Sequence, residues 1–459
     1  MLDVWNLLLL FLKCAEIKFY LKEELLMKKR TIMKKMLSMG LVGAMVLSLA
    51  ACGSSSSGDS EEASGDSGDG VTLEFQQWWG VELPDGALQE ICDDFTEETG
   101  INIELLSNPY ADTKTQIAAG AAAGTMADVV GLDGSWVYDF GKQESIANLT
   151  DLMTDAGYDD SQLSDQIQVD GSTYMIPVVN FAYPLYVNMD ILEEAGVSEV
   201  PTTWSEFLDA CDKITSNTDA SAFAIPLSSE APNGIQNQFM TWLWASGGAM
   251  LEDGKPNLEG NEDLEKVVDF VKEMKDNGYL SDGVEAMKEQ DMVNEFENGR
   301  LAFMVDAIAH LTLIKKESPD LNFDYAKMPV MDGYEGESGM DVANWGIGIA
   351  ENCENKEEAW QFVEYLMSPE VNAKLAQLAN AFPGNATAEP DYSESDELFL
   401  KAYDIFQTGY AINEFTGAPT SEDLMRSFNE QLVLYLDGDI ASAADMLSAA
   451  QESWAPAFE

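Results

Sequence analysis

The side chains that most enzymes use for chemistry are scarce in this sequence. His310 is the only histidine among 459 residues, and it stands in an apolar run, AIAHLTLI. A Ser-His-Asp triad would have to use it, but a packed histidine is the commoner occupant of such a run. The sequence holds no G-x-S-x-G, P-loop, G-x-G-x-x-G or H-E-x-x-H motif. We therefore predict no catalytic residue and no cofactor. A glycoside hydrolase, which needs only two carboxylates, stays open as an alternative.

Metal-ligating residues do not cluster in the sequence either. Beyond residue 51 the cysteines are Cys52, Cys92, Cys211 and Cys353, with no C-x-x-C and no local Cys/His group, so we predict no metal site. Cys92 and Cys211 fall within amphipathic helical patterns and are expected to be small buried hydrophobic residues. One disulfide among the three later cysteines remains open.

Tryptophans near predicted strand ends favour a different chemistry. A sugar ring has an apolar C–H face and a polar rim, so an indole can stack on the face while carboxylates and amides bond the hydroxyls. In open α/β sheets, ligands bind beyond the carboxyl ends of the strands. The candidates are Trp345 with Trp78 or Trp79, followed by Trp242, Trp244 and Trp136. Trp204 and Trp360 lie on predicted helices and are expected in the core.

Alternating strands and helices must position these residues. Val71, Leu73 and Phe75 alternate with polar residues, as in a half-buried strand. Leu88 and Phe95 then follow helical spacing, which Gly100 ends. The predicted order is a strand over 71–80, a helix over 88–95, a strand over 101–106, a helix over 115–123 and a strand over 128–130. This order predicts an α/β fold with a parallel core.

The most specific stretch runs from Gly171 to Phe207. An apolar extended run over 174–179 contains Pro177, which forbids an unbroken central strand. A second extended run follows over 183–187, then a short helix that Gly196 closes. Thr203-Trp204-Ser205-Glu206 is a capping box, in which the Thr and Glu side chains bond the first free amides of a helix.

This stretch resembles the extracellular solute-binding proteins of ABC importers, specifically the carbohydrate-binding group typified by maltose-binding protein. The matching landmarks are Tyr174, Ile176-Pro177, Leu185-Tyr186-Val187-Asn188, Ala195-Gly196 and Pro201 to Phe207. Further landmarks follow in the family's order: Phe296 to Met304, Lys327-Met328-Pro329 and Asn344 to Ile349. Ala127 departs from the family, which has Pro at that turn.

The resemblance implies a two-lobe, type II periplasmic-binding-protein-like fold whose lobes are joined by crossing strands. Lobe 1 would comprise 71–179 plus 345–404, and lobe 2 would comprise 183–343 plus 411–459. The family also implies ligand-bonding positions at Asp133, Asn180, Tyr183 and Asp306. Ala309 stands where the family often has Trp, so one stacking platform is missing.

The implied function is capture of a sugar or oligosaccharide by hinge closure and delivery to a membrane permease, without catalysis. Within the same family, a non-sugar solute such as a polyamine remains an alternative ligand. The sequence does not identify the sugar, its length or linkage, or the permease.

The N-terminal region indicates export. A basic head and an apolar segment over 27–51 end in Leu49-Ala50-Ala51-Cys52, which resembles the bacterial lipobox. We expect residues 1–51 to be a signal peptide, with 27–51 as the true signal. Cys52 would carry lipid that anchors the protein to the outer face of the cell membrane. Residues 52–70, rich in Ser and Gly, would form a flexible tether.

The chain is strongly acidic. Its formal charge is −58, and it becomes −62 without residues 1–51, which carry eight Lys or Arg and four Asp or Glu. Such a charge repels nucleic acid, so we expect no nucleic-acid partner. We expect a monomer whose partners are a carbohydrate ligand and the permease subunits.

Overall fold

The computed structural model describes residues 70–459. The predicted signal peptide over 1–51, the lipidation of Cys52 and nearly all of the linker lie outside the described residues. Within 70–459, no helix is both long and apolar enough to cross a membrane.

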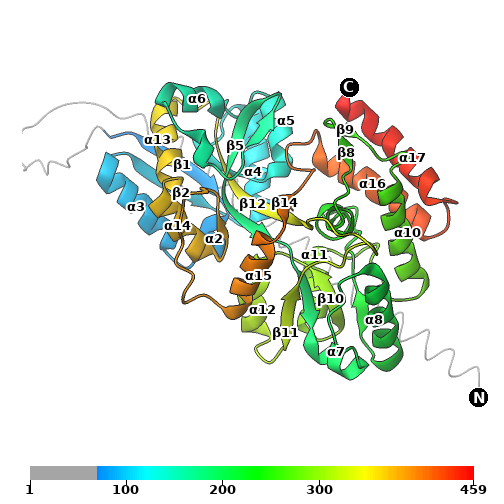
Figure 1. Cartoon of the computed structure of the whole chain (residues 1–459). Coiled ribbons are helices and arrows are strands. Elements are labelled where there is room, and N and C mark those ends of the chain that lie inside the picture. The colour runs from blue at the N-terminus through cyan, green and yellow to red at the C-terminus, as the bar shows by residue number, and fades with distance from the viewer. Residues whose placement is uncertain (1–69) are drawn as a thin grey trace, which may run out of the picture. The chain divides into compact units, whose positions relative to one another are not determined.

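The first strands of the described chain belong to a large mixed sheet (Figure 1). Its strand order is β13-β5-β12-β3-β1-β2, with β4 paired to β5 and β14 paired to β12. β1 pairs in parallel with both β2 and β3, which confirms the predicted parallel core. β12 is antiparallel to β3 and to β5. The bounds are β1 (Thr72–Gln77), β2 (Asn102–Ser107), β3 (Val129–Leu132), β4 (Ile167–Val169), β5 (Ser172–Ala182), β12 (Gly339–Ile349), β13 (Phe382–Pro383) and β14 (Tyr410–Ile412).

Helices from both ends of the sequence accompany this sheet. α3 buries Leu88 and Phe95, as their helical spacing predicted, together with Ile91 and Cys92, and it ends at Gly100 with φ of 75°. Lys374 of α14 bonds Glu90 of α3 at 3.0 Å, so segments far apart in sequence lie side by side. The bounds are α2 (Trp79–Glu82), α3 (Ala87–Thr99), α4 (Tyr110–Ala123), α5 (Val137–Lys142), α6 (Leu149–Ala156), α13 (Lys356–Leu366) and α14 (Pro369–Ala379).

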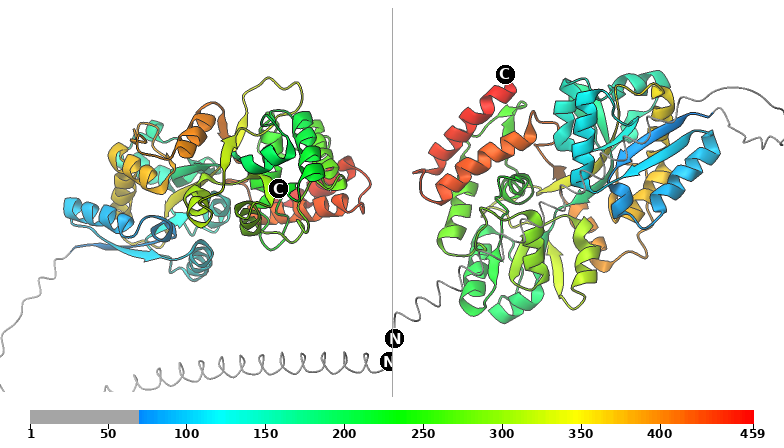
Figure 2. Two further views of the ribbon diagram at one scale, coloured as in Figure 1. Left: turned by 90° about the horizontal axis from the view of Figure 1, so that it is seen from below. Right: turned by 180° about the vertical axis from the view of Figure 1, so that it is seen from behind.

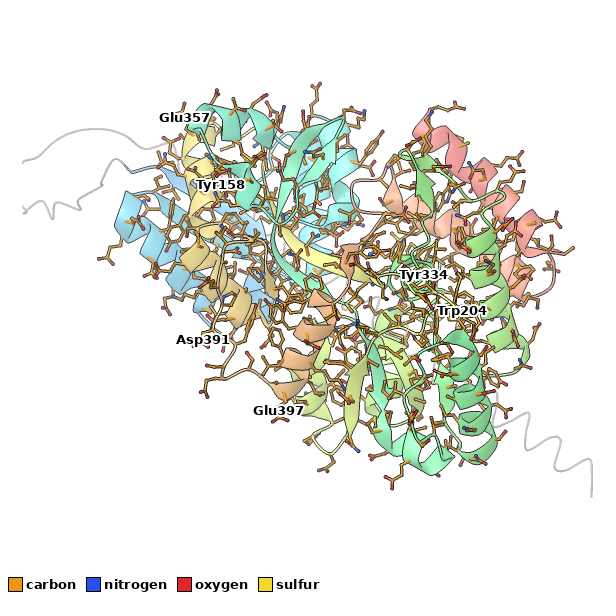
Figure 3. The ribbon with its side chains drawn as sticks, in the orientation of Figure 1. Tyr158, Trp204, Tyr334, Glu357, Asp391 and Glu397 are labelled. Atoms are coloured by element: carbon orange, nitrogen blue, oxygen red, sulfur yellow. The ribbon has the colours of Figure 1, made fainter. Side chains whose placement is uncertain are left out.

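A smaller sheet has the order β11-β6-β10-β7. The Thr203 and Glu206 side chains form the predicted capping box at the start of α8. Trp204, labelled in Figure 3, stacks on Phe270 with ring centroids 4.3 Å apart. The strand bounds are β6 (Leu185–Asn188), β7 (Ser221–Phe223), β10 (Leu301–Val305) and β11 (Phe323–Ala326). The helix bounds are α7 (Met189–Ala195), α8 (Trp204–Asn217), α9 (Thr241–Trp244), α10 (Glu262–Asp276), α11 (Glu289–Glu297) and α12 (Leu311–Glu317).

The C-terminal helices pack on α10, next to one another in both views of Figure 2. Tyr435 of α16 donates its hydroxyl proton to Asp269 of α10 at 2.6 Å. The Trp454 indole of α17 donates to the Leu424 carbonyl oxygen at 2.9 Å. The remaining bounds are α15 (Glu397–Gln407), α16 (Ser421–Leu436), α17 (Ala443–Trp454), β8 (Leu251–Glu252) and β9 (Lys255–Pro256).

The chain passes between the two sheets at three places. β5 of the large sheet leads into β6 of the small one, and β11 of the small sheet precedes β12 of the large one. α15 contacts β11, and β14 then pairs with β12 before α16 begins.

Pro177 does not interrupt its strand, contrary to the sequence prediction. β5 runs unbroken through it and lies between β13 and β12. The register with β12 shifts between Trp345 and Gly346, and Pro177 faces Gly346 at that irregularity. A bulge tolerates a residue without an amide donor, which explains the exception.

The three cysteines of the described region are free and buried, as expected for Cys92 and Cys211. Burial raises the pKa of the Cys92 thiol to about 12 and of the Cys353 thiol to about 12, and it raises that of Cys211 further. All three thiols are therefore neutral and unreactive in the folded protein.

Candidate functional site

An acid and a histidine form the centre of the candidate site. Asp306 follows β10 and is fully buried, while the His310 side chain is 29% exposed. Asp306 Oδ2 lies 2.6 Å from His310 Nδ1. The Asp306 charge outweighs desolvation and raises the pKa of His310 to about 9. At neutral pH His310 is therefore an imidazolium, and it is paired with the Asp306 side chain.

Glu289, at the first position of α11, completes a cluster with this pair. One ligand atom from each of the three residues lies within 4.8 Å of the others. Burial, followed by the Asp306 charge, raises the pKa of Glu289 to about 8, while a hydrogen bond from Asn237 lowers it. Glu289 is thus mostly protonated at neutral pH and can donate as well as accept a hydrogen bond. We call Glu289, Asp306 and His310 the acid–histidine cluster.

The spacing of the acid–histidine cluster would also accept a divalent cation. Asp306 Oδ2 and His310 Nδ1 bond each other directly, so a cation would have to displace the proton between them. The other carboxylate oxygen, Asp306 Oδ1, is buried and has no hydrogen-bond partner among residues 70–459.

Glu82, at the end of α2, belongs to the large-sheet side of the site. Desolvation by the protein around its carboxyl group raises the pKa of Glu82 to about 7, whereas the His310 charge and a hydrogen bond from the Trp345 indole lower it. Glu82 lies on α2, beside the large sheet, whereas His310 immediately precedes α12 on the small-sheet side. Because the His310 charge lowers the pKa of Glu82, the two residues lie close enough to belong to one site.

Trp345 lies behind Glu82 in a buried stack. Its indole is 5% exposed and stacks on Trp79, with ring centroids 5.6 Å apart and planes 8° from parallel. Phe181 contacts Trp345 edge-on at 5.2 Å. The stack presents little ring surface to solvent.

Trp78, Tyr110 and Trp136 form an aromatic wall beside Asp133. Tyr110 lies 5.2 Å from each of the other two rings, centroid to centroid. Its hydroxyl donates to Asp133 Oδ2 at 3.2 Å. The Tyr110 side of the wall is open, with 39% of that residue exposed, whereas Trp78 is 3% exposed.

Acids from both sheets surround the hydroxyl of Tyr183. This buried tyrosine follows β5, and Asn237 donates to its hydroxyl at 3.5 Å. Burial raises the pKa of Tyr183 well above its ordinary value, and nearby carboxylates raise it further: Glu289, Asp341, Asp306 and Asp133. The aromatic wall and the acid–histidine cluster therefore belong to one site.

The structure brings most of the residues proposed from the sequence together. Those at or directly behind the site are Trp78, Trp79, Asp133, Tyr183, Asp306 and Trp345. Trp136, which the sequence favoured no more than Trp242 and Trp244, joins them in the aromatic wall.

The structure places three other candidates away from this cluster. Trp242 is fully buried against Phe207 and Phe270 in the small-sheet core. Trp244 is also fully buried, and its indole donates to Glu414 at 2.7 Å. Asn180 lines a separate cavity behind the crossing strands. The sequence located these residues near junctions but did not reveal which way their side chains point.

Sequence reasoning missed several members of the site. They are Glu82, Tyr110, Asn237, Glu289 and His310. Tyr110 could have been found, because it follows Asn108-Pro109 directly after the carboxyl end of β2. His310 was expected to be packed in an apolar run, but it is partly exposed and paired with Asp306.

Chemically, the site offers one open aromatic surface and a ring of groups that bond hydroxyls. Neutral Glu289 and the Asn237 amide can donate or accept, His310 donates, and Asp133 accepts. Such a set suits a solute with an apolar face and a polar edge.

Known proteins share both the sequence pattern and the fold. The family model of the bacterial extracellular solute-binding protein matches residues 90–401, more than half of the chain. A Brucella abortus (strain 2308) protein is 28% identical over 301 residues, covering 64% of this chain and 72% of the relative. The diacetylchitobiose binding protein DasA of Streptomyces coelicolor is 24% identical over 380 residues, covering 78% and 85%.

A solved structure shows the same fold. The GacH receptor of Streptomyces glaucescens matches with a TM-score of 0.67 at 19% identity, covering 84% of this chain and 98% of that one. The two-lobe, type II periplasmic-binding-protein fold expected from the sequence is confirmed. By its family match, the chain belongs to the bacterial extracellular solute-binding proteins.

Proposed function

We propose that this protein captures a sugar or oligosaccharide outside the cytoplasmic membrane and delivers it to the permease of an ABC importer. One observation supports the proposal above all. The exposed Tyr110 side chain lies in the same site as Asp133, Asn237 and the acid–histidine cluster. An aromatic face and alternating donors and acceptors complement a pyranose ring. The names of related proteins support the class: DasA is a diacetylchitobiose binder, and the GacH receptor was solved with acarbose.

The charge state of the site favours a neutral ligand over a polyamine. Although several carboxyl groups gather there, the Asp306 charge is balanced by His310. Glu289, with a pKa of about 8, is mostly neutral at pH 7, and Glu82, with a pKa of about 7, is about half ionised. A polyamine would need several ionised carboxylates, and the charge states of Glu289 and Glu82 reduce their number at pH 7.

The two-lobe division supports a closing motion. We assign 71–179 plus 345–404 to one lobe and 183–343 plus 411–459 to the other, with the passages near Asn180, Trp345 and Tyr410 as the hinge. Ligand that contacts both lobes selects the closed state. Small-angle scattering should then show a smaller radius of gyration at saturating ligand.

A thermal-shift screen tests the ligand class. The panel contains neutral mono- and oligosaccharides, with putrescine and spermidine as cationic competitors, because a ligand that binds only the folded state raises the melting temperature. We expect a neutral saccharide to give the largest shift. A shift with polyamines alone would move the protein to the alternative ligand class, and no shift with any solute would contradict the proposal.

The same samples test the hydrolase alternative, which the raised pKa of Glu82 keeps chemically possible. An oligosaccharide that shifts the melting temperature is incubated with the protein, and reducing ends are assayed. A binder leaves the oligosaccharide intact, whereas release of reducing ends would identify an enzyme.

A further inference from the structure

A second cavity lies behind the crossing strands, apart from the site described above. It has a volume of about 440 Å³ and is lined by residues of 164–168, β5, β12 and the segment 406–416. This volume falls within the range of roughly 300–1,000 Å³ that is usual for small-molecule pockets. The segment 406–416 includes β14, which pairs with β12.

The strand register separates this cavity from the sugar site. Asn344 of β12 is paired with Asn180 of β5, and both line the cavity. The next residue, Trp345, stacks on Trp79 and meets Phe181 instead. Because neighbouring side chains of a strand point to opposite faces, the two asparagines face away from the Trp345 side.

The cavity holds polar groups that the protein itself does not satisfy. The Asn344 Oδ1 atom is buried and has no hydrogen-bond partner among the described residues. Asn180 and Asn413 donate to carbonyl oxygens only at 3.5 Å, the outer limit of a hydrogen bond. A buried amide oxygen without a partner costs free energy, so a ligand that donates to it is favoured over an empty cavity.

The lining chemistry specifies the class of ligand. Side-chain amides and the Thr416 hydroxyl supply donors and acceptors without charge, and Phe406 supplies an apolar ring. Asp165 is the only charged residue in the lining. Hydroxyl groups both donate and accept, so a neutral polyhydroxylated molecule matches this lining better than an ion does.

We propose that this cavity, the hinge pocket, binds a neutral polyhydroxylated molecule of about monosaccharide or sugar-alcohol size, at a place distinct from the sugar site. The pocket is lined by β5 and β12, the two long strands of the large sheet that connect to the small sheet. Its shape therefore depends on the position of the two sheets relative to each other. An occupant stabilises the arrangement described here. By linkage, it must alter the affinity of the sugar site whenever closure changes the pocket.

Saturation-transfer NMR with three separate probes, D-glucose, D-mannitol and glycerol, tests the proposal. Gln168→Trp places a large ring over the pocket from the exposed position 168 on β4. Gln89→Trp, at an exposed position on α3, is the matched control. Tyr110→Ala impairs the sugar site and leaves the hinge pocket untouched.

We expect at least one probe to give a signal that survives in Tyr110→Ala and Gln89→Trp but disappears in Gln168→Trp. Asn344→Leu removes the unsatisfied amide and keeps a side chain of similar volume. It should weaken the binding of the same probe by at least about tenfold, which corresponds to the loss of a single hydrogen bond. It also serves as the second variant if Gln168→Trp misfolds. The absence of signal from all three probes, a signal lost in Tyr110→Ala, or one retained in both pocket variants would overturn the proposal.

Discussion

The indole rings of Trp79 and Trp345 lie parallel, with centroids 5.6 Å apart and planes inclined by 8°. Trp79 is fully buried and Trp345 is 5% exposed, so each ring covers the other. The sequence alone favoured Trp345 as a platform for the ligand. The stack instead favours a supporting role, in which Trp345 fixes the position of Glu82 through its indole N–H.

Trp345→Ala should therefore lower the free energy of unfolding by about 3–5 kcal/mol, as expected for deletion of a large buried side chain. Urea denaturation of the ligand-free protein measures this loss. Trp345→Phe retains part of the packing and should cost less. An unchanged ligand-free stability together with weakened sugar binding would restore the platform assignment.

Tyr110 is the better candidate for a stacking surface, because 39% of it is exposed while it packs against Trp78 and Trp136. Tyr110→Ala should weaken sugar binding by about 2 kcal/mol, or roughly thirtyfold in Kd. The ligand-free melting temperature should change little. Tyr110→Phe keeps the ring and loses only the bond to Asp133, so calorimetry should find most of the affinity retained. Equal losses in both variants would show that the hydroxyl, not the ring, binds.

Glu289 should make stability depend on pH in one direction. Its pKa rises from 4.5 to about 8 on folding, so its favourable contribution is complete below about pH 4.5 and is lost as pH rises toward 8. Glu289→Gln stays neutral throughout. The variant should therefore gain stability relative to wild type between about pH 5 and 8, as measured by urea denaturation at each pH. A difference that stays constant over this range would show that Glu289 is ionised in the folded state.

The lipobox predicts that Cys52 is lipidated, and Cys52 lies outside the residues that the structure describes. Wild type should partition into the detergent phase on Triton X-114 separation, and Cys52→Ala should move to the aqueous phase. Cys92→Ala, which changes a buried thiol, is the control and should remain in the detergent phase. Wild type found in the aqueous phase would argue against the anchor.

Local sequence rules predicted much of the fold because their determinants are local. The helix of α8 begins at the Thr203–Glu206 capping box, and α3 ends at Gly100, as the residue types required. Pro177 was misjudged because its tolerance depends on a register shift in a partner strand more than 160 residues away in sequence. No pattern around Pro177 reveals that shift.

The site was harder to predict for the same reason. The family resemblance implied Asp133 and Asp306, but the direction of the Trp242 side chain depends on core packing against Phe207 and Phe270. His310 and Glu289 are distant in sequence, and nothing near either of them predicts a raised pKa. Their properties arise only when β10 and α11 bring a buried aspartate between them.

The three hidden thiols have a consequence for how this protein must mature. If the chain is exported unfolded, as the export signal expected from the sequence would imply, Cys92, Cys211 and Cys353 meet an oxidising environment before the fold covers them. Any two can then pair in ways the native structure does not contain. In that case the core must fold faster than the thiols oxidise. A slowly folding variant would then be lost through mispaired disulfides before low stability of its folded state became limiting.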